Sequence, residues 1–462
     1  MLSALLRHVE QSAIPLHVPG HKGGVGLDAE LAPWLSKAAM LDLTELDGLD
    51  SLHAPLGPIA DAQALAAQLW RADKTFFLVG GSTVGVHAMI LASCKAGDTL
   101  LLPRDAHMSA HGGLILSGAK PRYLEPAPTG HGSWGPPDLD ALADALSRHR
   151  PKAVLLTRPS YCGDVTDLRP YAERIHEAGA LLLVDEAHGA HLGLHPALPA
   201  SALALGADAV VQSTHKMLGA LTPGAMLHLA AKGLDPARVQ HALSLLQTTS
   251  PSYLILASLD AARRHEATSP PARWEAPLRW AADAREALAK LPGLRVLPPG
   301  DPLKIAVDVR NAGLDGYEAA DFLAEAGVII EHATHRLVVA FMGPGTHESD
   351  LHALIEAFRK LSSEAKRPES PLLADPAMPP LPPMVVTPRD AFFAESREVP
   401  WASSVGQVAA ELVCPYPPGA PALVPGERIT QEVVEYLDGM RALGAQLAGP
   451  ADPTLSTIRI LA

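Results

Sequence analysis

The stretch Gln212-Ser-Thr-His-Lys-Met-Leu218 stands directly after the apolar run 207–211, which reads Ala-Asp-Ala-Val-Val. A short aliphatic run that ends in polar residues is typical of a buried strand whose end lies at the edge of a sheet. The polar end carries hydroxyls, an imidazole and the amine of Lys216. Because burial favours the unprotonated form of a lysine amine, we interpret Lys216 as a nucleophile that can form a Schiff base with a carbonyl group.

A second aliphatic run, 180–184, ends at Asp185 and continues as Glu-Ala-His188. Pyridoxal phosphate requires a lysine for its aldehyde and a carboxylate that keeps its ring nitrogen protonated, so that the ring can withdraw electrons. Singly, each residue is a weak signal, because a strand-end Asp is often a helix cap and a Lys is usually a solvated charge. Together, Lys216 and Asp185 predict pyridoxal 5'-phosphate as the cofactor.

The segment 75–85 offers a site for the phosphate of such a cofactor. A short strand over 75–79 leads into Gly80-Gly-Ser-Thr-Val-Gly85, and we expect a helix over 86–94. Glycines let the backbone approach a phosphate, helix N-terminal amides point toward it, and Ser82 and Thr83 add hydroxyls. The spacing is neither Gly-x-Gly-x-x-Gly nor that of a Walker loop, so dinucleotide and nucleoside-triphosphate sites do not fit.

Strand-like and helix-like segments alternate through the first half of the chain. We expect further strands at 99–102, 121–124, 153–157, 180–184 and 225–229, and helices at 59–71, 108–116, 137–148 and 168–178. This alternation predicts an α/β fold with a mostly parallel sheet, helices on both of its faces, and a site at the C-terminal ends of the strands.

His107 follows the strand expected at 99–102 and could stack on a pyridine ring. Its spacing from His111 could instead place two metal ligands on one helix face. No Glu follows His107 as it does in His-Glu-x-x-His, so no metal site is expected. A histidine satisfied by hydrogen bonds in a loop is the remaining alternative.

Composition disfavours several classes of protein. The 462 residues carry a net charge of −13 without a block of like charges, which disfavours a nucleic-acid partner. The three cysteines are not in Cys-x-x-Cys spacing, so neither a disulfide framework nor a zinc site is indicated. No segment approaches the roughly 20 apolar residues of a membrane-spanning helix. We therefore expect a soluble, cytoplasmic protein with no membrane partner.

The chain is expected to begin with an arm, 1–58, that contains the loop Pro15-Leu-His-Val-Pro-Gly-His-Lys22. This loop is either a plain turn or a segment that reaches an active site, such as that of a neighbouring subunit, with His21 as a candidate substrate contact. Lys22 is the competing candidate for the cofactor lysine. The expected order of the other parts is a large cofactor-binding domain (59–272), a small α+β domain (273–367), a Pro-rich linker (368–388) and a C-terminal α+β domain (389–462).

Eight ordered motifs, spread over nearly the whole chain, resemble those of the ornithine/lysine/arginine decarboxylases in their short bacterial form, and most of all arginine decarboxylases. The motifs are Pro15–Lys22 above, Glu45-Leu-Asp-Gly-Leu-Asp50, Gly81-Ser-Thr83, Asp105-Ala-His-Met-Ser109, Asp185-Glu-Ala-His188, Gln212-Ser-Thr-His-Lys216, Thr248-Thr-Ser-Pro251 and Pro415-Tyr-Pro-Pro-Gly419. The resemblance implies the aspartate-aminotransferase fold (fold type I), whose large domain has a mostly parallel, seven-stranded sheet.

The resemblance also implies roles for single residues. Lys216 would hold the cofactor, Asp185 would pair with the ring nitrogen, and His107 would stack on the ring. The residues implied around the phosphate and beside the ring are Ser82, Thr83, Ser213, His215 and His188. Gly80 stands where the family often has Asn, so one side-chain contact with the phosphate is expected to be missing.

The reaction implied is decarboxylation of a basic L-amino acid to its amine and carbon dioxide in polyamine biosynthesis, with arginine first and lysine or ornithine next. Glu411 is the candidate that would bind the basic side chain, because carboxylates select guanidinium and ammonium groups; an exposed structural Glu is the alternative. The fold implies a homodimer or higher homo-oligomer with shared sites. Two alternatives stay open: another pyridoxal reaction, such as that of an aminotransferase, aldolase or β-lyase, and an inactive regulatory paralogue.

Overall fold

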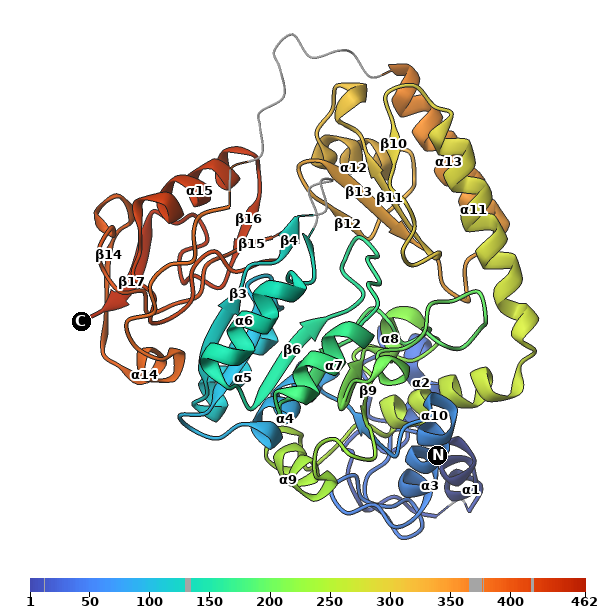
Figure 1. Ribbon diagram of the computed structural model, residues 1–462. Helices are drawn as coiled ribbons and strands as arrows, with labels where there is room; N and C mark the ends of the chain where they lie inside the picture. Colours follow the sequence, from blue (N-terminus) through green and yellow to red (C-terminus); the bar gives the residue numbers. More distant parts are fainter. Residues whose placement is uncertain (12, 129–133, 365–375, 377, 417–418) are drawn as a thin grey trace. The chain divides into compact units, whose positions relative to one another are not determined.

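The computed structural model describes all residues except 12, 129–133, 365–375, 377 and 417–418 (Figure 1). The chain divides into two compact units, Met1–Ser93 with Leu181–Pro271, and Cys94–Ala180 with Ala272–Ala462. The Pro-rich linker expected at 368–388 lies partly outside the described residues. The same holds for the motif at 415–419, of which Pro417 and Pro418 are not described.

The first unit contributes four strands to the main sheet, in the order β1-β9-β8-β7. Strands β7 and β8 are parallel, whereas β9 runs antiparallel to both of its neighbours. The central residues of β7 and β8 are fully buried aliphatic side chains, and those of β1 include the buried Phe76 and Phe77, as expected for strands covered on both faces. The strands are β1 (Lys74–Leu78), β7 (Leu181–Asp185), β8 (Ala209–Gln212) and β9 (Ala225–Leu229). The helices are α1 (Leu2–Glu10), α2 (Ala32–Ala39), α3 (Pro58–Trp70), α4 (Gly81–Ser93), α8 (Thr214–Met217), α9 (Pro236–Leu246) and α10 (Tyr253–Thr268).

Helix α4 lies directly on the strands of this unit because residue 85 is glycine. A Cβ atom at Gly85 would lie 2.4 Å from Val211 and 2.8 Å from Leu78, so a larger residue does not fit. The sequence predicted a turn up to residue 85, and this boundary was wrong, since α4 begins at Gly81. Gly81 has a φ of +78°, a conformation open to glycine, and so lets β1 lead straight into the helix.

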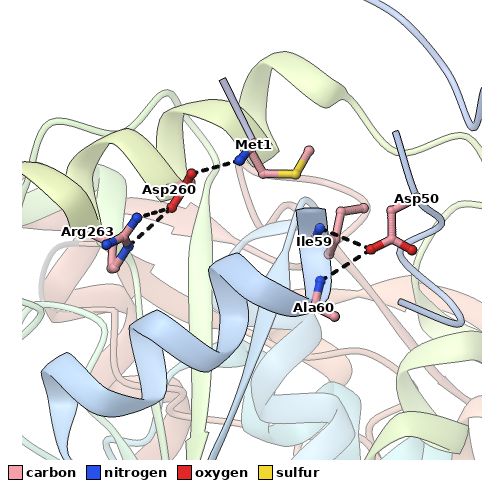
Figure 2. Close-up of polar contacts among 6 residues, drawn as sticks. All are labelled: Met1, Asp50, Ile59, Ala60, Asp260 and Arg263. Carbon is pink, nitrogen blue, oxygen red and sulfur yellow. Dashed lines mark hydrogen bonds and ion pairs between the residues drawn. The ribbon is translucent and has the colours of Figure 1, made fainter. Parts of the chain in front are cut away.

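Polar contacts of Asp50 and of the amino group of Met1 help to hold the arm on the rest of the first unit (Figure 2). Asp50 Oδ2 accepts hydrogen bonds from the N–H groups of Ile59 (3.0 Å) and Ala60 (3.3 Å) and thereby caps α3. Burial acts to raise the pKa of Asp50, but its backbone N–H donors outweigh burial and leave the pKa lowered. The amino group of Met1 donates to Asp260 (2.9 Å), which also pairs with Arg263.

The second unit contains three parallel strands, in the order β6-β2-β3. These strands are β2 (Thr99–Pro103), β3 (Lys120–Leu124) and β6 (Ala153–Thr157), and the helices between and after them are α5 (Met108–Ser117), α6 (Leu139–His149) and α7 (Arg169–Glu177). A short antiparallel pair, β4 (Ala127–Pro128) and β5 (Trp134–Gly135), follows β3.

A four-stranded antiparallel sheet, in the order β10-β11-β13-β12, forms the next part of the second unit. Helices α11 and α13 lie along each other beside it (Figure 1). Its strands are β10 (Arg295–Val296), β11 (Lys304–Asp308), β12 (His332–Ala333) and β13 (Leu337–Phe341), and its helices are α11 (Glu275–Ala289), α12 (Gly316–Glu325) and α13 (Glu348–Glu364).

The C-terminal part of the second unit has its own apolar core, which includes Leu423, Val433, Leu437 and Ile460. Strands β14 and β17 pair antiparallel, as do β15 and β16. The elements are α14 (Pro388–Phe393), β14 (Ser396–Pro400), β15 (Cys414–Tyr416), α15 (Gln431–Ala442), β16 (Gln446–Ala448) and β17 (Thr457–Leu461). The predicted fold class, a mostly parallel sheet with additional α+β parts, is therefore confirmed.

No helix within the described ranges is both long and apolar enough to span a bilayer.

Candidate active site

Lys216 lies in α8, a single helical turn that follows β8 at once. Its Nζ is 3.0 Å from Nε2 of His188. His188 belongs to the segment after β7, and Ser213 N donates to Ala187 O of that segment at 3.2 Å. Because β7 and β8 are parallel neighbours, with Asp185 opposite Val211, both strands bring their polar ends to one edge. The predicted lysine and carboxylate therefore lie on adjacent strand ends of the same unit.

Asp185 is 6% exposed, and its Oδ1 accepts a hydrogen bond from Ala187 N at 3.0 Å. A nearly buried carboxylate at this edge is costly unless a cation or a strong donor pairs with it. A protonated ring nitrogen is a donor of this kind. The position of Asp185 thus fits the carboxylate that such a cofactor needs.

The predicted phosphate residues come from two elements that meet. Ser213 Oγ donates to Ser82 Oγ at 2.8 Å, which joins the end of β8 to the first turn of α4. Thr83 lies exposed in that turn, where N–H groups lack intrahelical acceptors. Thr214 is 1% exposed, and its Oγ1 has no hydrogen-bond partner among the described residues. Hydroxyls and free amides that converge in this way suit a phosphate group.

Gly80 makes this cradle possible, because a Cβ atom there would lie 2.7 Å from Val84 Cγ2. His215 borders the same segment, and its Nδ1 and its backbone N both lie 3.1 Å from Gly224 O. Burial lowers the pKa of His215, and Lys216 lowers it further. His215 is therefore neutral near pH 7 and meets a phosphate as a hydrogen-bonding group. The residues of the first unit fit pyridoxal phosphate.

A series of buried polar residues, joined by hydrogen bonds, lies directly behind these residues, and the sequence analysis missed it. Glu186 is fully buried and accepts hydrogen bonds from Ala202 N (2.8 Å) and Gln212 Nε2 (2.7 Å). Gln212 Oε1 is 3.1 Å from His228 Nε2, and His228 Nδ1 is 2.8 Å from Thr75 Oγ1. Burial lowers the pKa of His228 to about 3, so this imidazole is neutral and donates to Gln212 while it accepts from Thr75.

This series of hydrogen bonds connects β7, β8, β9 and β1 beneath the strand ends. Glu186 follows Asp185, and Gln212 precedes Ser213, so the hydrogen bonds between them hold the two polar ends in register. Glu186 and Gln212 are polar residues at positions where the strand pattern predicts apolar side chains, and this was the signal that could have revealed them.

Three predicted site residues, His107, His21 and Glu411, make hydrogen bonds to groups other than Lys216 and Asp185. His107 belongs to the second unit, where it caps α5 by accepting from Ser109 N at 3.2 Å. His21 Nε2 is 3.2 Å from Asp42, and its Nδ1 accepts from Gly24, so its contacts lie within the arm. The roles of His107 and His21 at an active site stay predictions.

Glu411 accepts backbone N–H bonds with both carboxylate oxygens, from Ala451 and from Arg459, each at 2.9 Å. These bonds connect the strands of the C-terminal part and favour the structural alternative for Glu411. Its role in substrate binding stays an untested prediction.

Comparison with known proteins agrees with this geometry. The family described as Orn/Lys/Arg decarboxylase, major domain, matches residues 1–306, and the C-terminal domain of the same family matches residues 373–452. Arginine decarboxylase of Bacillus subtilis is 34% identical over 480 aligned residues, which cover 100% of this chain and 97% of that protein.

Solved structures show the same fold. Lysine decarboxylase LdcF of Francisella novicida superposes with a TM-score of 0.86 at 20% identity, over 99% of this chain and 80% of that one. The ureidoglycine–glyoxylate aminotransferase of Bacillus subtilis reaches a TM-score of 0.54 at 16% identity, over 66% of this chain and 85% of that one. The fold is that of the decarboxylases and aminotransferases of fold type I, and by sequence this chain belongs to the Orn/Lys/Arg decarboxylase family.

Proposed function

We propose that this chain is a pyridoxal-phosphate-dependent decarboxylase that converts arginine to its amine and carbon dioxide. The observation that carries the proposal is the placement of Lys216 beside His188, at the edge where Asp185 and the Ser82–Ser213 pair also lie. Arginine is the first substrate because the relative that matches the whole chain at 34% identity is an arginine decarboxylase. A role in polyamine biosynthesis and a cytoplasmic location stay predictions.

The bound cofactor would supply an electron-withdrawing ring that stabilises the negative charge left on Cα when carbon dioxide departs. Lys216 would bind the cofactor covalently, and the amino group of the substrate would replace the lysine amine in that bond. Asp185 would hold the proton on the ring nitrogen. His188, 3.0 Å from the lysine amine, is placed to exchange a proton with it when the substrate enters and the product leaves.

The direct test is to supply the purified protein with pyridoxal phosphate and with arginine, lysine and ornithine in parallel, while carbon dioxide and amine are measured. We expect release from arginine, with lysine and ornithine slower. An enzyme that instead forms a keto acid without carbon dioxide would be an aminotransferase. A protein that neither reacts nor binds the cofactor would favour the regulatory paralogue.

We also propose that the working form is a homo-oligomer, because the arm exposes large apolar side chains that a monomer would leave in water. Within this one segment, six side chains are between 65% and 94% exposed: Ile14, Leu16, Val18, Val25, Trp34 and Leu56. A second copy of the chain is the partner that this family fold favours.

Light scattering should therefore give a mass that is a multiple of 48.5 kDa at micromolar concentration. Replacing Leu16 and Trp34 together by aspartate should shift the protein toward 48.5 kDa, because burying these charges in an interface is costly. The matched change of Leu245, which is 72% exposed outside the arm, should leave the mass unchanged. A wild-type protein that is monomeric at this concentration would contradict the proposal.

A further inference from the structure

Four hydrogen-bonded residues of the first unit, Glu186, Gln212, His228 and Thr75, form what we call the buried series. Each of them is at most 1% exposed. In the register of the strands, His228 lies diagonally across from Gln212 and directly opposite Thr75. Successive residues of a strand alternate between its two faces, so Glu186 and Asp185 point to opposite faces of the sheet. The series therefore lies behind the face that carries Asp185.

The hydrogen bonds of the buried series run in one direction. As a carboxylate, Glu186 accepts, so Gln212 turns its NH₂ group toward Glu186 (2.7 Å) and its Oε1 toward His228 (3.1 Å). His228, which is neutral, then donates from Nε2 and accepts at Nδ1 from the hydroxyl of Thr75 (2.8 Å). Loss of a middle member would leave buried polar groups unsatisfied on both of its sides, which is costly.

Both ends of the series are held by further contacts within the same unit. The other carboxylate oxygen of Glu186 accepts from Ala202 N at 2.8 Å. At the far end, the His228 ring stacks on Trp70, with centroids 5.3 Å apart and planes at 29°. Trp70 Nε1 donates to Ala190 O (3.2 Å), which belongs to the segment after β7. The series is thus held at a fixed place under the strand ends.

Two members of the series are neighbours in sequence of predicted cofactor residues. Glu186 follows Asp185, the carboxylate expected at the ring nitrogen. Gln212 precedes Ser213, whose hydroxyl bonds to the first turn of α4 at the predicted phosphate site. The backbone joins these two strand ends through Ser213 N and Ala187 O at 3.2 Å, where β7 and β8 both stop. The bond between Glu186 and Gln212 fastens the strand ends at the point where their backbone pairing ends.

We propose that the buried series consists of positioning residues, which fix the distance between the site for the cofactor's ring nitrogen at Asp185 and the site for its phosphate at Ser213. The inference rests on the proposed function, because it concerns the cofactor of that reaction. A rigid ligand with two ends binds well only when both of its sites are held at the matching distance. A ligand that occupies one end is insensitive to that distance.

The test compares two such ligands on the full-length protein without bound cofactor. Pyridoxamine phosphate has both ends but no aldehyde, so it binds without a covalent bond to Lys216. Inorganic phosphate has one end, and its affinity is measured by competition with pyridoxamine phosphate. In Gln212→Met, the dissociation constant of pyridoxamine phosphate should rise about 10- to 100-fold, the size seen when a hydrogen-bond partner behind a metal-binding residue is removed. The dissociation constant of phosphate should change by less than about threefold, because one end of the site stays intact.

A matched variant at the other end of the same strands is the control. Asp208 is 6% exposed, and its Oδ2 accepts from Leu182 N at 2.7 Å, so it joins the starts of β8 and β7. It stands four positions before Gln212, about 13 Å along an extended strand. Asp208→Leu removes this buried contact without a change of shape. It should lower the thermal stability and leave both dissociation constants as in the wild type.

His228 offers a second pair of variants, which stays informative if Gln212→Met fails to fold. His228→Phe keeps a flat ring against Trp70 but removes both nitrogen atoms, and it should weaken binding of pyridoxamine phosphate about fivefold or more. His228→Gln places an amide NH₂ group near the position of Nε2, so it can still donate to Gln212 and should recover most of the affinity.

The two proposals fail differently. If the wild type binds pyridoxamine phosphate and Gln212→Met and His228→Phe bind it equally well, the positioning assignment is overturned while the function stands. An equal loss of affinity for phosphate in these variants, or an equal loss in Asp208→Leu, would also overturn the assignment, because the series would then only support the fold. A wild type that binds neither pyridoxal phosphate nor pyridoxamine phosphate would overturn the proposed function itself.

Discussion

Replacing Lys216 by alanine should abolish covalent attachment of pyridoxal phosphate and lower the decarboxylation rate by roughly 10⁴-fold or more, as expected when a covalent nucleophile is removed. The physical reason is that Lys216 supplies the amine at the edge where Asp185 also lies, with its Nζ 3.0 Å from His188 Nε2. The measurement is reduction of the cofactor-loaded protein with borohydride, followed by mass spectrometry of its peptides. In the wild type the added mass should lie on the peptide that contains Lys216.

Two matched variants make the result specific. Lys216→Arg keeps the positive charge but cannot lose its proton, so it should fail in the same way as alanine. Lys22→Ala removes the competing lysine, whose Nζ donates to His17 O within the arm, and should retain the labelled Lys216 peptide. A label that stays in Lys216→Ala and disappears in Lys22→Ala would assign the cofactor to the arm and overturn the proposed site.

Removing the charge of Glu427 should destabilise the second unit locally by about 3–5 kcal/mol, because it leaves a buried guanidinium without its counter-ion. Arg104 is 2% exposed and Glu427 is 1% exposed. The guanidinium also donates to Pro421 O and Ala422 O, both at 2.8 Å, and stacks over the Tyr123 ring at 4.8 Å. The ion pair thus joins the loop after β2 to the C-terminal part of the chain.

The measurement is hydrogen exchange of the full-length protein, which reports local opening without requiring two-state unfolding. In Glu427→Gln, amides around residues 421–428 should exchange roughly 10²- to 4×10³-fold faster. The double variant Arg104→Met with Glu427→Leu should recover part of the protection, because it replaces the pair by apolar side chains. Exchange in Glu427→Gln as slow as in the wild type would show that the ion pair contributes little. Equally fast exchange in the single and double variants would show that the unpaired guanidinium is not what destabilises this part.

The sequence predicted the elements around the site because their signals are local. The runs before Asp185 and before Lys216 are aliphatic over the length of a strand, and their polar ends follow at once. The sequence assigned the glycines at positions 80, 81 and 85 to a phosphate-binding turn, and the structure shows in addition that Gly85 lets α4 lie against Val211 and Leu78. The start of α4 was misplaced because a positive φ at Gly81 lets a helix begin earlier than a glycine-rich turn suggests.

The residues that the sequence did not reveal depend on contacts between distant segments. Glu186 and Gln212 resemble ordinary polar residues in the sequence, yet their side chains meet behind the strand ends at 2.7 Å. The hydrogen bonds of Glu411 come from the backbone N–H groups of positions 451 and 459, which the sequence did not reveal, and its role in substrate binding stays a prediction.

The sequence by itself determined the order of strands and helices, the membership in the decarboxylase family, and the candidate cofactor residues on the ends of β7 and β8. These follow from hydrophobic periodicity and from motifs, which are properties of neighbouring residues. The tertiary structure decided which side chains are buried and hydrogen-bonded, such as Glu186 with Gln212 and Glu411 with two backbone N–H groups. The physical reason is that burial and hydrogen-bond partners, which set the charge and availability of a side chain, arise only when segments distant in the chain pack together.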